Sequence, residues 1–254
     1  MSTHRPILLL LIASVFVATL AVGGPFANFR KRKEEQRSAP TQVSLSAAEV
    51  QKVGRKIWDN ESNGTVQGLT SWNEGEYFPS LGIGHFIWYV KGNEGPFDES
   101  WPKLLAYFQA NGVPYPRWLK RTPDCPWPDR ETFEADRESE RMVELRNFLQ
   151  TTIDEQTRFI IARLEAALPK MLQHGARNRE EQAQLQRNFA AVGTTGQGVY
   201  ALIDYVNFKG EGTKPEERYQ GVGWGLAQVL LEMNGNPQGA QASVEFSEAA
   251  KRVL

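Results

Sequence analysis

Cysteine and histidine are scarce in this sequence, and their scarcity excludes several kinds of site. Cys125 is the single cysteine, so an intrachain disulfide framework is impossible. The three histidines, His4, His85 and His174, are scattered along the chain, which excludes a Cys/His zinc cluster. We therefore expect no metal and no cofactor. If the protein is an enzyme, we expect its chemistry to rest on carboxylates and hydroxyls.

An excess of charge of one sign is also absent. The chain has 29 Lys and Arg against 30 Asp and Glu, a formal charge of -1. Nucleic-acid binders usually carry a basic excess or stripe, so no nucleic-acid partner is expected. A hydrophobic share of 41% and a charged share of 23% are ordinary for globular proteins. This composition argues against wholesale disorder and against a polytopic membrane protein.

Long apolar runs are absent too, apart from one near the N-terminus, from Ile7 to Val22. As a helix it would reach about 24 Å, short of the roughly 30 Å hydrocarbon core of a bilayer. Its basic start and small-residue end are typical of a secretory signal or a short anchor. We therefore interpret residues 1–24 as a signal peptide or N-terminal membrane anchor, residues 25–44 as a linker and residues 45–254 as one domain.

The charges after this run favour a different orientation. Arg30, Lys31, Arg32 and Lys33 outnumber the charges before the run, which by the positive-inside rule keeps the C-terminal domain in the cytoplasm. Cleavage or hairpin insertion would outweigh that bias. Export to the periplasm or another extracytoplasmic space is therefore our prediction, with possible inner-membrane association through residues 7–22. A cytoplasm-facing tethered protein is an alternative.

Helical signals dominate the remainder of the chain. Apolar spacing predicts helix over 136–168, interrupted near Thr151 and Thr152, and also over 197–209 and 223–233. The best strand candidate is 80–90, which is rich in β-branched and aromatic residues. The five prolines in 112–129 predict an ordered loop without regular structure. The expected fold class is mainly α with a small β-hairpin or sheet (α+β).

A helix is predicted to start at Ser46, which forms a capping box with Glu49. At ~100° per residue, Val50 and Ile57 point the same way, and Glu61 lies within about 20° of Val50 around the helix axis. Glu61 thus projects from the buried face near the helix C-terminus, where lost hydration and the helix dipole disfavour the ionised form. A general acid needs that environment. A frayed or ion-paired glutamate is the alternative.

The next segment of the chain ends in Ser80-Leu81-Gly82-Ile83-Gly84-His85. A helix-end Glu, an acidic turn, a hydroxyl and Gly-Ile-Gly-His resemble, in that order, the lysozyme-like superfamily, particularly phage-type lysozymes (endolysins). The resemblance implies Glu61 as general acid, Glu74 as the hairpin carboxylate, Ser80 as the catalytic hydroxyl and His85 as the final histidine. The sequence differs from the family pattern in having Glu for Asp and a longer spacing, so Glu76 is an alternative to Glu74.

A second resemblance is to lytic transglycosylases of the same superfamily. Glu61-Ser62 followed by Gly68-Leu69 is similar to their Glu-Ser and Gly-Leu pattern. Residues 205–212 are similar to their Tyr-Asn-x-Gly-x-Gly stretch, although Val206 intervenes and the Asn-to-Gly distance is longer by one residue. This likeness implies that Tyr205 positions the catalytic Glu61 and that Asn207 lies at the substrate.

Aromatic side chains are candidates for contacts with sugar rings. Trp72 and Trp88 flank the proposed site, and Trp118 lies in the Pro-rich loop, which we interpret as a wall or lid of the groove. Packing in the core is the alternative for each of them. Likewise, His85 is a substrate-site candidate whose alternative role is a structural hydrogen bond behind the site.

The resemblance implies an exported enzyme that cleaves the glycan strands of peptidoglycan, as a lysozyme-type glycosidase or a lytic transglycosylase. Breaking a glycosidic bond requires a proton for the leaving oxygen and stabilisation of an oxocarbenium-like centre. Glu61 would supply the proton. The alternative is a non-catalytic cell-wall-binding or envelope scaffold protein with the same lysozyme-like fold.

Overall fold

The chain divides into two units, residues 1–40 and 41–254. The structure, a computed structural model, describes residues 43–254 apart from the side chain of Tyr219. The signal or anchor predicted for residues 1–24, and all but the last two residues of the predicted linker, lie outside the described residues. Within residues 43–254, no helix combines the length and the apolarity needed to cross a bilayer.

Helix α2 (Ala47–Ser62) opens the described domain as the sequence predicts. The Ser46 side chain accepts a hydrogen bond from the Glu49 main chain, and the Glu49 carboxylate accepts one from Ser46, which completes the capping box. Val50 and Ile57 are buried on one face of the helix. Asn63 adopts a left-handed conformation and ends the helix. The capping box and this stop fix which residues form the last turn, and Glu61 is one of them.

A small antiparallel sheet follows, made of β1 (Thr70–Ser71), β2 (Ser80–Leu81) and β3 (Phe86–Ile87) in that order. The prediction of one strand over 80–90 was wrong, because the chain reverses direction between β2 and β3. Gly82 has φ +67° and His85 has φ +45°, both in the left-handed region that no strand adopts. Gly82 and His85 therefore form a tight turn between β2 and β3.

The sheet packs with several short helices, and together they form residues 67–151, which we call the hairpin lobe. The predicted Pro-rich loop contains only one short helical turn, at 119–121. The helical elements of this lobe are η1 (Gln67–Leu69), α3 (Trp101–Ala110), η2 (Leu119–Arg121), α4 (Arg130–Ala135) and α5 (Glu140–Thr151).

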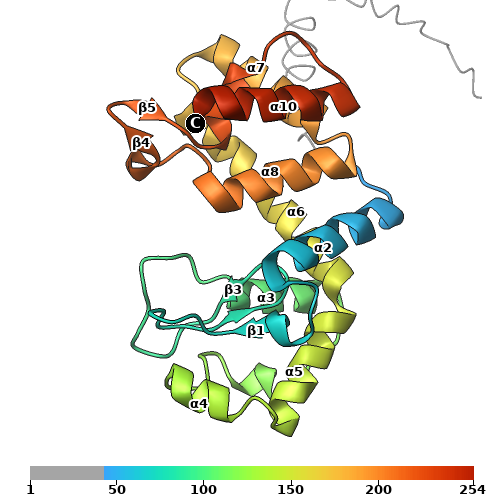
Figure 1. Ribbon diagram of the computed structural model, residues 1–254, viewed down its shortest axis with the longest axis vertical. Helices are drawn as coiled ribbons and strands as arrows, with labels where there is room; N and C mark the ends of the chain where they lie inside the picture. The colour runs from blue at the N-terminus through green and yellow to red at the C-terminus, as the bar shows by residue number, and fades with distance from the viewer. Residues whose placement is uncertain (1–42) are drawn as a thin grey trace, which may run out of the picture. The chain divides into compact units, whose positions relative to one another are not determined.

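Helix α6 (Ile153–Lys170) crosses the domain (Figure 1). The predicted interruption is confirmed, since α5 ends at Thr151 and α6 begins at Ile153. Helix α6 packs against α2 and α3 and also against α8 (Gly196–Lys209), so it connects the hairpin lobe to the rest of the domain.

Residues 171–254 form the helical lobe. Helix α8 and its cap, Gly210 with φ +82°, lie where the sequence predicts them. The predicted helix 223–233 is shorter than expected, because Gly223 belongs to a two-stranded sheet and the helix begins at Leu226. The other elements are η3 (Met171–Gly175), α7 (Arg179–Val192), η4 (Pro215–Glu217), β4 (Arg218–Tyr219), β5 (Val222–Gly223), α9 (Leu226–Glu232) and α10 (Ala240–Val253).

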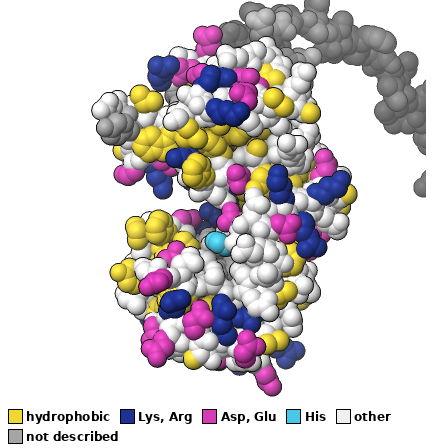
Figure 2. All heavy atoms as spheres, in the orientation of Figure 1, with side chains coloured by type: hydrophobic (Ala, Val, Ile, Leu, Met, Phe, Trp, Pro, Cys, Tyr) yellow, Lys and Arg dark blue, Asp and Glu magenta, His cyan; other side chains and the backbone are white. Residues whose placement is uncertain are grey.

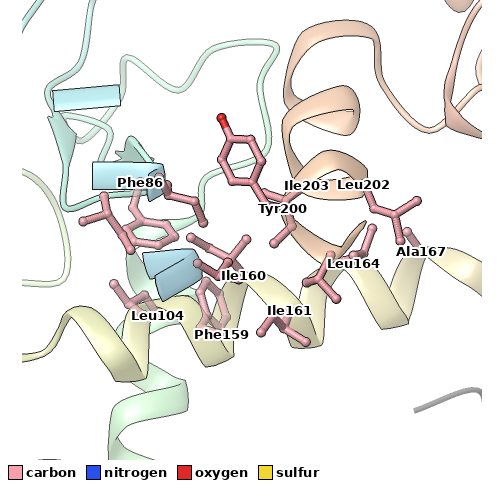
Figure 3. Close-up of a cluster of buried hydrophobic side chains, with 14 of the residues drawn as sticks. Phe86, Leu104, Phe159, Ile160, Ile161, Leu164, Ala167, Tyr200, Leu202 and Ile203 are labelled. Carbon is pink, nitrogen blue, oxygen red and sulfur yellow. The ribbon is translucent and has the colours of Figure 1, made fainter. Parts of the chain in front are cut away.

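One hydrophobic core runs through both lobes (Figure 3). Phe86 of β3 meets α6 at Phe159, and further along α6 Leu164 lies beside Ile203 of α8. The expected class, mainly α with a small antiparallel sheet, is confirmed. The continuous core holds the end of α2, the turn between β2 and β3, and α8 in fixed relation to one another.

Candidate active site

Glu61 lies in the last turn of α2, and its side chain is 31% exposed. The sequence predicted a buried acid, and the structure corrects this to a half-buried one. The reason is its place at the helix end, where the covering elements leave part of the carboxylate open. Glu61 is therefore neither enclosed nor directed wholly into bulk water, as a proton donor to a bound substrate requires.

His85 lies directly against Glu61. Its Nε2 is 2.8 Å from the main-chain carbonyl oxygen of Glu61, and its Nδ1 is 3.9 Å from the Glu61 carboxylate. A carbonyl oxygen only accepts hydrogen bonds, so Nε2 carries the hydrogen in neutral His85. The lone pair of Nδ1 then faces the Glu61 carboxyl group. The structural hydrogen bond considered for His85 is present, and its acceptor is the main chain of the candidate acid itself.

The two hairpin carboxylates lie in the loop between β1 and β2. Glu74 is exposed, whereas Glu76 is half-buried and its carboxylate accepts a hydrogen bond from Asn73 Nδ2 at 3.1 Å. Among the described residues, neither carboxylate pairs with Glu61 or His85 in this structure. Both stay candidates for the second carboxylate: Glu74 is the more exposed group, and Glu76 is held by the Asn73 hydrogen bond.

Ser80 occupies the middle strand of the sheet, opposite Ser71 on β1 and Ile87 on β3. Its side chain is buried, at 4% exposure. The buried hydroxyl is not open to a substrate in this structure, which contradicts the catalytic role predicted for Ser80. Direct contact with a bulky substrate would require the strand to move.

Tyr205 does not approach Glu61 as the sequence predicted. Its hydroxyl donates a hydrogen bond to the main-chain oxygen of Trp224 at 2.7 Å, and its ring packs edge-on against Phe246. Burial raises the pKa of Tyr205 to about 12. Because α8 turns this side chain toward α10, Tyr205 stabilises the helical lobe. Its predicted role as the partner of Glu61 is incorrect in this structure.

Tyr200, earlier on α8, is the tyrosine whose hydrogen bonds reach the end of α2. Its hydroxyl is hydrogen-bonded to Asn60, the residue before Glu61, and donates to the Asp204 carboxylate at 3.0 Å. Burial and the Asp204 hydrogen bond raise the pKa of Tyr200 to about 12, and the nearby Glu61 charge acts in the same direction. In Figure 3 this hydroxyl points away from the core, toward the space between the β-strands and α8. In the sequence, only the i, i+4 spacing of Tyr200 and Asp204 indicates that these two side chains lie next to each other on the helix.

Two of the three candidate tryptophans are core residues. Trp72 is 5% exposed and donates its indole hydrogen to the Glu76 carbonyl, and Trp88 is fully buried and donates to the Pro123 carbonyl. They do not offer open faces to a sugar, and their predicted role in substrate binding was wrong. Large aromatic rings in a chain of this size are needed to fill the core of the hairpin lobe.

Trp118 belongs to a different part of the hairpin lobe. Its ring stacks on Trp88 at 6.3 Å between centroids, and Arg141 lies over it. With Tyr115 it lines a groove against α5 that includes none of the residues around Glu61. The Pro-rich segment therefore does not form the wall or lid that we expected at the candidate site.

Asn207 is exposed near the end of α8 and lines a pocket between α6, α8 and the turn that carries His85. Gly84 forms the hairpin side of this pocket, and Arg163 and Glu211 are its charged members. Glu211 also lies 4.0 Å from Lys170 Nζ. The pocket has an apolar floor from α6 and α8, so Asn207 stays a candidate for substrate contact beside the Glu61–His85 pair.

The exposed apolar side chains, which the sequence did not single out, lie on both lobes. On the hairpin lobe, Tyr77 is 75% exposed and Phe97 60%; on the helical lobe, Phe208 is 68% exposed and Val222 67%. We propose that these four side chains border the space between the lobes, and we call them the rim residues. Figure 2 shows a crevice between the lobes, with hydrophobic side chains gathered on both of its rims and a histidine and acidic side chains at its inner end.

Residues 43–254 contain no group of three or more His, Cys, Asp or Glu side chains arranged to hold a metal ion. Comparisons of the chain with protein-family models, with curated proteins and with solved structures found no match.

Proposed function

We propose that this protein has a lysozyme-like fold and cleaves the glycan strands of peptidoglycan, with Glu61 as general acid. One observation carries the proposal: a half-buried carboxylate at a helix end is held against the imidazole of a Gly-Ile-Gly-His turn. The two lobes and the long helix α6 between them support it, because together they border a crevice that has a histidine and acidic side chains at its inner end (Figures 1 and 2).

The chemistry starts at the glycosidic oxygen. Glu61 donates its proton to that oxygen as the bond breaks, and the sugar ring takes on oxocarbenium-like charge. In neutral His85 the hydrogen is on Nε2, so Nδ1 can only accept a hydrogen bond. At 3.9 Å from the Glu61 carboxylate, Nδ1 is too far away to hold the carboxyl proton in a hydrogen bond, and the proton is available to the substrate.

The second half of the reaction has two possible routes. In a hydrolase, Glu74 or Glu76 activates water or stabilises the positive charge. In a transglycosylase, a hydroxyl of the substrate itself attacks, and one carboxylate is enough. The exposure of Glu74 and the absence of a contact with Glu61 among the described residues favour no route by themselves. The products decide between the routes, since a hydrolase leaves reducing ends and a transglycosylase leaves anhydro-muramyl ends.

The proposed substrate is a long polymer. The rim residues lie far apart in the sequence and belong to both lobes, and an extended chain bound between the lobes would contact both. Peptidoglycan is the polymer that the sequence resemblance implies, and export of the domain would bring it to this substrate. A scaffold that binds the wall without cleaving it would use the same crevice.

Purified full-length protein incubated with isolated sacculi tests this proposal. We expect release of soluble muropeptides, a rate at least about 100-fold lower in Glu61→Gln, as for removal of a general acid, and little change in Glu245→Gln. Glu245 is a matched control because it is also partly buried, at 22% exposure, but lies on α10. Sacculus binding without any release by the wild-type protein would instead identify a scaffold.

A further inference from the structure

Gln156, in the first turn of α6, has a fully buried side chain whose amide makes three hydrogen bonds. Its Oε1 accepts from the Ile83 main-chain nitrogen at 3.0 Å. Its Nε2 donates to the Leu149 carbonyl at 2.6 Å and is 3.1 Å from Thr152 Oγ1. One side chain thus connects the end of α5, the start of α6 and the turn between β2 and β3.

The two main-chain groups that Gln156 contacts, the Ile83 N–H and the Leu149 carbonyl, each need a hydrogen-bond partner. Ile83 lies inside the turn, outside the paired residues of β2 and β3, so its N–H has no strand partner. Leu149 lies in the last turn of α5, where main-chain carbonyls lack helical donors, and its carbonyl otherwise accepts a long hydrogen bond from Thr152 Oγ1 at 3.5 Å. An unsatisfied buried group costs about 1–3 kcal/mol, so the Gln156 amide strongly favours this one arrangement of the turn.

The turn is shaped around the Gln156 side chain. Gly82 has φ +67°, and a Cβ added there would lie 2.3 Å from Gln156 Oε1. The Gly82 carbonyl in turn accepts from the His85 main-chain nitrogen at 3.4 Å, and His85 has φ +45°. This uncommon conformation directs the imidazole to the end of α2, where it meets the Glu61 carbonyl.

We infer that Gln156 is the positioning residue of the Glu61–His85 pair. It fixes the turn through Ile83, the turn fixes the direction of the His85 ring, and the ring holds the last turn of α2. Gln156 touches neither Glu61 nor the crevice, so it acts only through His85. The inference rests on the proposed function for its effect on catalysis, whereas its effect on His85 can be measured independently.

The ring nitrogens of His85 report this positioning directly. Nitrogen-15 NMR distinguishes the protonated from the unprotonated ring nitrogen, and the full chain has only three histidines, so a His85→Asn variant assigns the signals. In the wild-type protein at a pH where His85 is neutral, we expect the hydrogen on Nε2 alone. In Gln156→Met, which has similar length but no amide, we expect a mixture of both tautomers because the ring no longer faces its carbonyl.

Gln184→Met is the matched control. Gln184 is half-buried, and its amide also donates to a main-chain carbonyl, that of Leu231, at 2.8 Å, but it lies on α7. We expect Gln156→Met to lower kcat by on the order of 10- to 100-fold with KM changed less than about twofold, since the rim contacts remain while the reacting group is misplaced. Gln184→Met should keep the wild-type tautomer and kcat.

A second variant disturbs the contact between Gln156 and the turn by a substitution in the turn itself. Gly82→Ala places a methyl group against Gln156 Oε1 and keeps the glutamine, whereas Gly75→Ala adds one at a similar φ of +82° with no atom within 4 Å. If Gln156→Met does not fold, Gly82→Ala decides: it should show mixed tautomers, and Gly75→Ala the wild-type tautomer. Retention of Nε2 protonation in the folded Gln156→Met and Gly82→Ala proteins would overturn the inference.

The test of the proposed function is separate. If the wild-type protein is inactive on sacculi, the proposed function is overturned, and the NMR result alone then tests whether Gln156 positions His85.

Discussion

The imidazole Nε2 of His85 lies 2.8 Å from the main-chain carbonyl oxygen of Glu61, and its Nδ1 lies 3.9 Å from the carboxylate of the same residue. One ring therefore contacts both the helix end and the candidate acid. The carbonyl is one of the last in α2, where the helix dipole is negative, so a hydrogen-bond donor stabilises the helix end. The contact joins the small sheet to α2 and keeps Glu61 at the crevice.

Tyr200 and Tyr205 offer a direct comparison of two buried phenols on one helix. Tyr200→Phe removes the hydrogen bonds to Asn60 and Asp204, next to Glu61, and we expect turnover of sacculi to fall about tenfold or more. Tyr205→Phe removes the bond to the Trp224 carbonyl and should leave turnover near the wild-type rate. Both variants should lose about 1 kcal/mol of unfolding free energy in urea titrations. Greater loss of turnover in Tyr205→Phe would restore the role that the sequence predicted for it.

The same two tyrosines predict how stability changes at high pH. Their pKa is raised from 10.0 to about 12, mainly by burial, so the folded state favours the protonated phenol. A raised folded-state pKa contributes stability that is fully present below about pH 10 and is lost as the pH rises toward about 12. We expect the free energy of unfolding to fall across this window, and to fall less steeply in Tyr205→Phe. Equal slopes in wild-type and variant protein would show that Tyr205 titrates normally.

The rim residues predict which surface substitutions weaken binding to the wall. Phe208→Ala removes a 68% exposed ring, and we expect about a fivefold weaker affinity for sacculi, which corresponds to roughly 1 kcal/mol. Val222 on β5 and Val244 on α10 are a matched pair, at 67% and 63% exposure. In co-sedimentation with sacculi, Val222→Ala should bind more weakly than the wild type, and Val244→Ala should bind as the wild type does. Equal binding by both variants would show that the rim does not contact the wall.

Local signals in the sequence predicted much of the fold. The capping box at Ser46, the interruption near Thr152 and the cap at Gly210 all depend on residues within one helical turn, and all three are confirmed. The strand predicted over 80–90 was wrong because Gly82 and His85 take left-handed conformations. β-propensity depends only on the side-chain types of the segment itself. It cannot predict a turn that Gln156, on a distant helix, stabilises through the Ile83 main chain.

The candidate site was predicted less completely than the fold. Helix periodicity placed Glu61 beside the core, and the structure places it there with His85 against it. The resemblance to the Tyr-Asn-x-Gly-x-Gly stretch predicted Tyr205 as the partner of Glu61, whereas Tyr200 bonds to the neighbouring Asn60 and Tyr205 bonds to the Trp224 carbonyl. The tryptophans were misassigned because a large ring fills a core as readily as it binds a sugar, and only tertiary contacts distinguish the two roles.

Glu61 is proposed to act in turnover and not to be needed for binding. The decisive quantity is the rate of muropeptide release by Glu61→Gln, measured at a protein concentration at which co-sedimentation shows the same amount bound to sacculi as for the wild type. We expect unchanged binding, within about twofold, and a release rate lower by at least about 100-fold. Release by Glu61→Gln at the wild-type rate would refute the role of Glu61 as general acid.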